Sequence, residues 1–371
     1  MHYLRNRLLS ASIISTALLT GCPAQDGATV KDLPTLVQTA ARDGGIPGLA
    51  AAVISTDNIQ SSVTGVRKSG FVIPIAGSDR FHLGSNIKAM TATLAAMLVE
   101  SGVIQWSVTL ADIFPEMSAS MRAEYRNVTL EQLLVHRGGI VPLTEPNELA
   151  RLPAMAADPL RARVQLTAWL LQQPSAATPG STAKYSNGGY AIAAAMLERK
   201  TGQAYEILLS DLVLRPLSIV AHYEWPAAID AAQPWGHEKI NNRWVPNDPL
   251  ASENQFPGAL TPAGNISLSI TDYARFVQSQ LRGLRGAGGS LSATGYRYLH
   301  TPNGEFASGW IVRELAGVRT SAHDGSAGTY YALAVIQPER NRAVVVLSNA
   351  FSDAVANDAN ALALKLLELT R

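Results

Sequence analysis

The feature that most constrains the fold is the order of strand and helix patterns, because strand patterns occupy both ends of the chain and helical patterns the middle. Near the N-terminus, GIPGLAAAVIS leads from turn residues into a short apolar run, and residues 61–66 and 71–75 also resemble strands. Near the C-terminus, GWIVREL, GTYYALAVIQ and NRAVVVLSNA are rich in Val, Ile and Tyr. The PERN segment between the last two predicts a hairpin turn, so these strands should be antiparallel neighbours.

Helical spacing of apolar residues predicts helices in the middle of the chain and at both ends. We expect helices over 33–42, 129–135 (capped by Thr129, with Gln132 three residues later), 189–202, 270–284 (capped by Ser269 or Thr271) and 353–371. The order predicts an α/β (α+β) fold in which an antiparallel sheet is built from both ends of the chain, flanked by terminal helices, with an all-helical lobe inserted.

In this interpretation residues 32–371 form one catalytic domain. The sheet lobe comprises about 32–84 and 262–371, and the helical lobe comprises about 85–261. A catalytic site is expected in the groove between the two lobes.

The first residues have the pattern of an export signal. Arg5 and Arg7 precede an apolar run from Leu8 to Leu19, which is short for a membrane span and typical of a signal peptide. The run ends in Leu-Thr-Gly-Cys, which resembles the lipobox of bacterial lipoproteins. We predict a signal peptide over 1–21, lipidation of Cys22, a tether over 22–31, and an exported protein anchored to a membrane. The alternative is an ordinary signal peptide with an incidental cysteine.

Composition excludes several other classes. The chain has 371 residues, 47% of them hydrophobic and 16% charged, with a net charge of +1, so nothing indicates a nucleic-acid partner. Its single cysteine cannot form an internal disulfide. No metal-ligand spacing, phosphate-binding loop or dinucleotide motif is found, so no metal or cofactor is predicted. The oligomeric state is not indicated.

A first candidate site is Ser85-Asn86-Ile87-Lys88 at the start of a strongly apolar helical run. Residues three apart share a helix face, so the Lys88 amine can reach the Ser85 hydroxyl. Burial disfavours the charged form of a lysine, which makes Lys88 a candidate base. The alternative is a helix cap followed by a lysine that extends to solvent. Ser181 and Lys184 repeat the spacing, but this second copy follows Thr-Pro-Gly and does not itself open an apolar helix, so we interpret it as a loop.

Two further segments carry polar groups suited to acyl transfer. Tyr185 and Asn187, on a loop before a predicted helix, offer a phenol for proton transfer and an amide for substrate. His323, Gly325 and Ser326 precede a predicted strand. Gly325 would let a substrate lie against the strand edge. The backbone N–H groups of Ser326 and Ser85 could hold an oxyanion. Taken singly, each segment is more typical of an ordinary turn or loop without a catalytic role.

Together these elements resemble the serine β-lactamase and penicillin-binding-protein family, in the branch with S-x-x-K, Y-x-N and H-x-G in this order. LLVHRGGIV, PGSTAKYSNGGYAIAAAMLERKTGQAY and AGNISLSITDYARFV resemble further segments of that family. The resemblance implies that Ser85 is the acylated nucleophile, Lys88 its activating amine and Tyr185 an acid/base partner. It also implies that Asn187 and His323 contact substrate and that His136 is structural.

The function expected from the resemblance is hydrolysis of an ester or amide through a covalent acyl-serine, of the esterase or D-amino-acid (cell-wall) peptidase type. A β-lactamase is the second hypothesis. The family's β-lactamases commonly have Lys where this chain has His323, and a neutral histidine is less suited to bind a substrate carboxylate. A third hypothesis, of another class, is a non-catalytic lipoprotein that binds cell-wall peptide.

Overall fold

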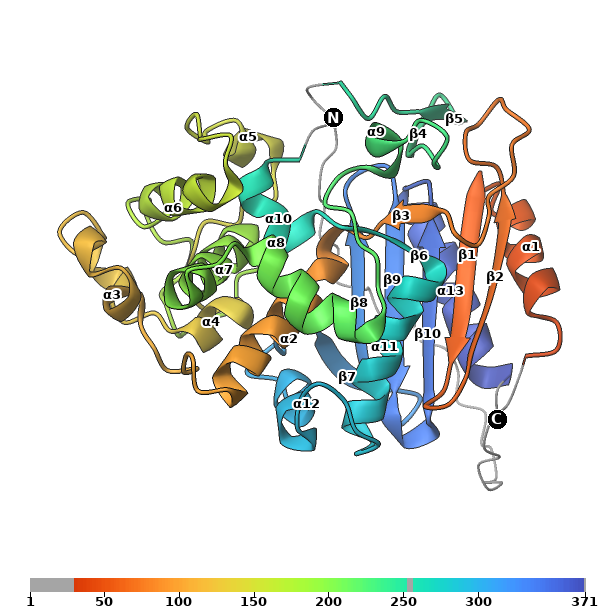
Figure 1. The fold of residues 1–371 in the computed structure, drawn as a ribbon. Helices are drawn as coiled ribbons and strands as arrows, with labels where there is room; N and C mark the ends of the chain where they lie inside the picture. The colour runs from red at the N-terminus through yellow and green to blue at the C-terminus, as the bar shows by residue number, and fades with distance from the viewer. Residues whose placement is uncertain (1–29, 252–255, 370–371) are drawn as a thin grey trace.

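A six-stranded antiparallel sheet forms one side of the molecule in this computed structural model, which describes residues 30–251 and 256–369 (Figure 1). The strand order is β2-β1-β10-β9-β8-β7. The strands are β1 (Gly48–Ile54), β2 (Ile59–Gly65), β7 (Ile311–Leu315), β8 (Val318–Ser326), β9 (Tyr331–Gln337) and β10 (Arg342–Ser348). The register pairs Leu49 with Ser348, which joins the first strand of the chain to the last. The predicted sheet from both chain ends is confirmed.

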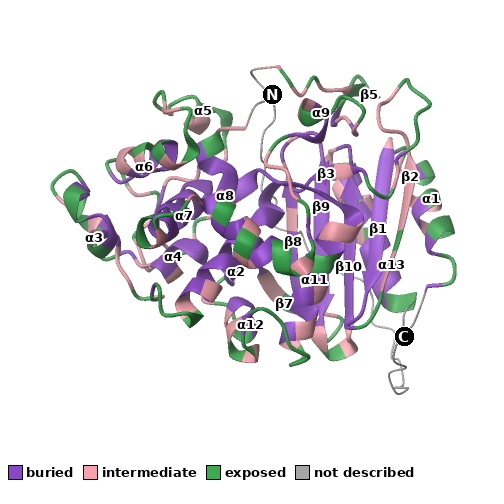
Figure 2. Cartoon of the chain, viewed as in Figure 1, coloured by how far each residue is buried: buried purple, intermediate pink, exposed green. Residues whose placement is uncertain are grey.

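Helices cover both faces of this sheet. On one face lie α1 (Leu33–Asp43) and α13 (Asp353–Leu369), and on the other lies α11 (Ile270–Leu284). Alternate residues of β1 therefore enter two different apolar clusters, Ala50 and Ala52 on one side and Ala51 and Val53 on the other. Because both faces of the sheet are covered, β1, β9 and β10 are buried along their whole length, and their sequences are nearly continuous apolar runs (Figure 2).

The helical part lies on the side of the molecule away from β1 and β2 (Figure 1). Its longest members are α2 (Ile87–Glu100), α6 (Pro159–Leu170) and α7 (Asn187–Thr201). Shorter ones are α3 (Leu110–Ile113), α4 (Leu130–Leu134), α5 (Pro146–Leu149), α8 (Tyr205–Leu208) and α10 (Thr261–Gly264). Two further helices lie elsewhere: α9 (Pro226–Ile229) beside β3, and α12 (Ala293–Leu299) against α2 and α11. Two small two-stranded sheets pair β3 (Arg80–His82) with β6 (Ser267–Ser269) and β4 (His237–Ile240) with β5 (Arg243–Pro246).

The local signals at several helix ends are confirmed. Thr129 and Gln132 form a reciprocal capping box at α4. Ser269, rather than Thr271, caps α11 by accepting a hydrogen bond from the Asp272 N–H. Gly202 ends α7 in the left-handed conformation, with φ 72°.

Two strand predictions are wrong. Residues 71–75 form no strand: Gly70 turns the chain at φ 86°, and Pro74, which has no N–H, makes only an isolated bridge to Val66. Conversely, β8 includes residues 318–326, where we expected the HDGS segment to precede a strand. Pairing with β7 on one side and β9 on the other makes this polar segment a strand despite its composition.

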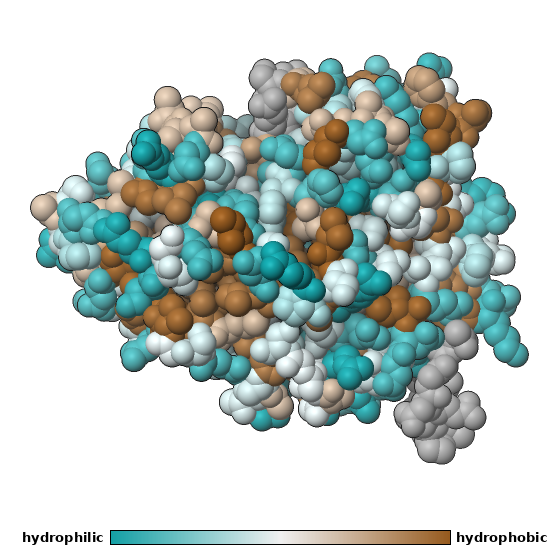
Figure 3. Space-filling model, in the orientation of Figure 1, coloured by the Kyte–Doolittle hydropathy of each residue, from teal (hydrophilic) through white to brown (hydrophobic). Residues whose placement is uncertain are grey.

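The visible surface is mixed in character. Figure 3 shows hydrophilic residues spread over both parts of the molecule, with smaller hydrophobic groups between them. Among the described residues, no helix is long and apolar enough to cross a membrane. The predicted signal peptide, Cys22 and nearly all of the predicted tether lie outside the described residues.

Candidate active site

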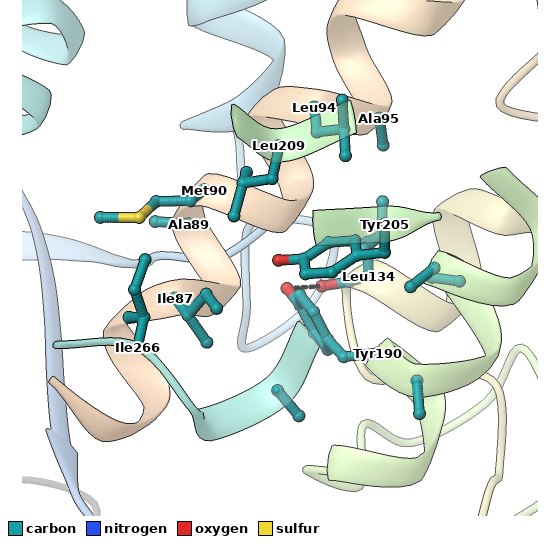
Figure 4. Packing of buried hydrophobic residues seen from close by; sticks show 14 of the residues in the cluster. Ile87, Ala89, Met90, Leu94, Ala95, Leu134, Tyr190, Tyr205, Leu209 and Ile266 are labelled. Atoms are coloured by element: carbon teal, nitrogen blue, oxygen red, sulfur yellow. Dashed lines mark hydrogen bonds between the residues drawn. The ribbon is translucent and has the colours of Figure 1, made fainter. Parts of the chain in front are cut away.

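The serine of the first motif lies in a tight turn directly before a long buried helix. Ser85 belongs to a 3-10 turn, η1 (Gly84–Asn86), which continues into α2. Asn86 anchors this turn: its amide donates to the backbone oxygens of Leu83, at 3.2 Å, and Ala332, at 3.0 Å. Figure 4 shows Ile87, Met90 and Leu94 of α2 packed among apolar side chains from neighbouring elements. The start of α2 is therefore fixed at both the turn and the sheet.

Lys88 is fully buried and surrounded by neutral acceptors. Its Nζ lies 3.1 Å from Ser85 Oγ, 2.7 Å from Asn187 Oδ1 and 2.6 Å from the backbone oxygen of Ala263. The structure thus brings Ser85, Lys88 and Asn187 together from two helices. Ala263, in α10, is a partner that the sequence analysis missed, because a backbone oxygen has no signature in the sequence.

Burial lowers the pKa of Lys88 well below its ordinary value of 10.5. No carboxylate lies within ion-pairing distance of the amine among the residues the structure describes. Three hydrogen-bond partners suit an uncharged amine: its two N–H groups can donate to the two carbonyl oxygens, which leaves the lone pair for the Ser85 hydroxyl. The arrangement can remove a proton from Ser85.

The second motif lies where α7 begins. Ser186 caps α7 by accepting from the Gly189 N–H at 2.9 Å, and Asn187 opens the helix. The Asn187 amide donates to the Leu143 oxygen at 2.9 Å, which orients its own oxygen toward Lys88. Tyr190, one turn later, donates to the Leu134 oxygen at 2.7 Å (Figure 4). The helix that carries Asn187 is thereby fixed to α4.

Tyr185 lies beside the amine. The centre of its ring is 4.6 Å from Lys88 Nζ, a distance at which a ring face attracts a cation. The ring also stacks on His136, with centroids 4.3 Å apart. The phenol is therefore in the same cluster as Ser85 and Lys88. The second copy of the serine–lysine spacing, Ser181 and Lys184, lies in turn and irregular chain, as predicted.

The third motif ends β8 against the serine turn. A side chain at Gly325 would place its Cβ 2.4 Å from the Leu83 oxygen and 2.6 Å from Ser85 N, so only glycine fits. A Cβ at Gly84 would similarly lie 2.8 Å from Ser326 N. The backbones of Ser85 and Ser326 are thus neighbours, as two donors to one oxyanion must be.

His323 is buried in β8 and uncharged. Burial is the main cause that lowers its pKa to about 3, and protonation of Lys88 would act in the same direction. Its Nδ1 lies 2.7 Å from the Asp324 oxygen, so in the neutral ring Nδ1 carries the proton and Nε2 the lone pair. His323 therefore supplies no fixed positive charge at neutral pH.

Among the described residues, no cluster of three or more His, Cys, Asp or Glu side chains could hold a metal ion.

Comparison with known proteins identifies the class. A model of the family described as Beta-lactamase matches residues 33–368. The chain therefore belongs to the beta-lactamase family, which confirms the predicted family and fold. Among curated proteins, it is similar to Penicillin-binding protein 4 of Amycolatopsis lactamdurans, with 24% identity over 82% of this chain and 81% of that protein.

Other relatives are more distant or longer. The chain is 24% identical to Unguisins hydrolase ungD of Aspergillus violaceofuscus over 82% of its own length but 58% of that protein. It is 20% identical to Protein flp of Staphylococcus aureus over 88% of its length and 64% of that protein. The chain thus spans about three-fifths of these two relatives. The family, with a penicillin-binding protein and a hydrolase among its members, supports a serine hydrolase that acts through an acyl-enzyme.

Solved structures share the fold. SurE superposes with a TM-score of 0.74 at 24% identity, over 91% of this chain and 75% of that one. An octameric penicillin-binding protein homologue from Pyrococcus abyssi gives a TM-score of 0.72 at 20% identity, over 90% of this chain and 77% of that one.

Proposed function

We propose that the protein is a serine hydrolase in which Ser85 attacks an ester or amide carbonyl and forms a covalent acyl-enzyme. The observation that carries the proposal is the buried Lys88 amine, 3.1 Å from Ser85 Oγ and hydrogen-bonded otherwise only to carbonyl oxygens. An uncharged amine in this position is a base, and the serine is an otherwise weak nucleophile that needs one.

The reaction proceeds in two steps. Lys88 takes the Ser85 proton as Oγ bonds to the carbonyl carbon, and the N–H groups of Ser85 and Ser326 stabilise the oxyanion. Collapse of this intermediate breaks the bond to the leaving group, which receives the proton by way of Lys88 and Tyr185. Water then attacks the acyl-serine with Lys88 and Tyr185 as base, releasing the acid. His323, with a pKa of about 3, is too weak a base for this step at neutral pH.

For the substrate we propose an ester or a D-amino-acid amide or peptide. The neutral His323 favours substrates that need no fixed cation in the third motif. One solved structure is that of SurE with D-Leu, which supports a D-amino-acid group for that relative. A β-lactamase is the second candidate, because the family is described as Beta-lactamase and one relative is named a penicillin-binding protein. We further propose export and lipidation at Cys22, based on the Leu-Thr-Gly-Cys sequence.

A hydrolysis panel tests the proposal. It comprises p-nitrophenyl esters, D-alanyl peptides and a chromogenic cephalosporin, each measured with the wild-type protein, Ser85→Ala and Ser181→Ala. Ser181 is the matched control, because it has the same spacing to a lysine but lies in a loop. We expect Ser85→Ala alone to lose turnover. Full activity in Ser85→Ala would overturn the assignment, and turnover of the cephalosporin alone would favour the β-lactamase.

A further inference from the structure

His136 contacts three successive residues where the second motif begins, Lys184, Tyr185 and Ser186. Its backbone oxygen accepts from the Lys184 N–H at 2.7 Å, and its Nδ1 accepts from the Ser186 N–H at 3.1 Å. Between these two bonds its ring stacks on Tyr185, with centroids 4.3 Å apart and planes 30° apart. We propose that His136 is a positioning residue that fixes the Tyr185 ring beside Lys88, an inference that rests on the proposed acyl-enzyme function.

The histidine is itself rigidly held. It is 3% exposed, and Phe306 meets its ring edge-on at 4.9 Å. Its backbone has φ 60°, a left-handed conformation rare for residues other than glycine, asparagine, aspartate and histidine. This conformation directs the chain out of α4 through the Gly138-Gly139 turn. A strained backbone of this kind persists only where surrounding contacts determine it.

The same geometry keeps His136 uncharged. Because Nδ1 accepts a hydrogen bond from the Ser186 N–H, a proton on Nδ1 would bring two N–H donors together without an acceptor. Burial is the main cause that lowers the pKa of His136 well below its ordinary value, and a positive charge on Lys88 or His323 would lower it further. The ring therefore supports Tyr185 without placing a positive charge beside Lys88.

The position of the ring matters for proton transfer. The Tyr185 ring centre lies 4.6 Å from Lys88 Nζ. The imidazole of His136 stacks on the Tyr185 ring and thereby prevents that ring from moving toward His136 and away from Lys88. Displacement of a reacting group by about 1 Å can cost about 100-fold in rate. Loss of the imidazole should therefore lower kcat strongly and change the affinity for substrate only slightly.

The test uses His136→Asn in the full chain. Asparagine tolerates the left-handed backbone and offers an oxygen near the position of Nδ1, so it mainly removes the ring. We expect kcat on the preferred ester to fall about 10- to 100-fold, with KM changed by less than about threefold. His300→Asn is the matched control, because His300 is equally buried and stacks on Trp310 at 4.8 Å. It should lose thermal stability but keep kcat.

A double-mutant cycle separates positioning from folding. If His136 acts through Tyr185, His136→Asn should cost little further kcat in a Tyr185→Phe background. Should His136→Asn not fold, His136→Gln replaces it in the same cycle. Unchanged kcat in the folded variant, or full additivity with Tyr185→Phe, would overturn the inference. Its failure is distinct from failure of the proposed function, which is judged by Ser85→Ala.

Discussion

Two buried cationic side chains in the helical part have opposite surroundings. Among the described residues, the hydrogen-bond partners of the Lys88 amine are neutral: the Ser85 hydroxyl and the oxygens of Asn187 and Ala263. Arg163, in α6, is also fully buried but donates to two carboxylates, with Nη2 at 2.6 Å from Glu198 and 2.8 Å from Glu206. Burial lowers the pKa of Lys88. Burial acts in the same direction on Arg163, but the hydrogen bonds that Arg163 donates to both glutamates raise its pKa above the ordinary value.

The difference in partners gives Arg163 a structural role and Lys88 a chemical one. Carboxylates compensate the charge of Arg163, so it stays protonated and connects α6 to α7 and α8. Neutral dipoles do not compensate a full charge on Lys88, so burial favours its uncharged form, which can accept a proton. Lys88 and Arg163 are both buried in the helical part, so burial alone does not distinguish a catalytic basic side chain from a structural one. The charge of the groups that it contacts makes the distinction.

The largest expected effect is that of Lys88→Met on activity. Loss of the base should lower kcat/KM by about 1,000-fold or more, with the fold retained, because methionine fills the space without a charge. Steady-state kinetics on the preferred ester measure this, with circular dichroism for the fold. The control is Lys184→Met, the lysine of the second serine–lysine spacing, which should change kcat/KM only a few-fold. Equal losses in the two variants would show that Lys88 has no special role.

Arg163→Met should have the converse effect. It leaves Glu198 and Glu206 without their cation, which should lower the free energy of unfolding by about 3–5 kcal/mol. Urea denaturation measures the loss. The fraction that remains folded should still react with a fluorophosphonate at the wild-type rate, because Arg163 donates to Glu198, Glu206 and Gly258 and, within residues 30–251 and 256–369, to none of the three motifs. A slower reaction of folded Arg163→Met with the fluorophosphonate would contradict the purely structural role of Arg163.

The two glutamates should differ from each other. Glu198 is 3% exposed at its side chain and also accepts from the Tyr205 N–H at 2.8 Å, whereas Glu206 is 21% exposed. Glu198→Gln should therefore destabilise by about 1–3 kcal/mol and Glu206→Gln by less. Urea midpoints of the two variants, measured side by side, check the order. The reverse order would mean that solvent exposure does not set the strength of these ion pairs.

A further expected effect is a pH dependence of stability. The pKa of Lys88 in the folded protein lies below 10.5, its ordinary value. At a pH between these two pKa values the unfolded chain therefore binds one more proton than the folded protein. The contribution to stability is therefore present above 10.5 and is lost as pH falls, by about 1.4 kcal/mol per pH unit. The difference between wild type and Lys88→Met, measured between pH 8 and 10, should show this slope. A flat difference would indicate an ordinary lysine pKa.

Much of the fold was predictable because its signals are local. Apolar runs marked β1, β9 and β10, and Thr129 and Gln132 marked the start of α4. The strand over 318–326 was not predictable, because its polar residues pair only through neighbours distant in sequence. The apolar residues 71–73 were misassigned, because no strand lies beside them and they remain exposed.

The site was predictable to a similar extent. Spacing alone brings Ser85 and Lys88 together, and family resemblance added Tyr185, Asn187 and His323. The Ala263 oxygen and the contact of His136 with Tyr185 depend on tertiary packing, which no spacing encodes. The Arg163 network likewise joins residues from three helices.

The central claim is that an uncharged Lys88 activates Ser85, and the rate of Ser85 modification by a fluorophosphonate as a function of pH tests it most directly. We predict a wild-type rate that rises with an apparent pKa well below 10.5, an adduct that mass spectrometry places on Ser85, and loss of the reaction in Lys88→Met. A rate that rises only near pH 10.5, or that is unchanged in Lys88→Met, would contradict it.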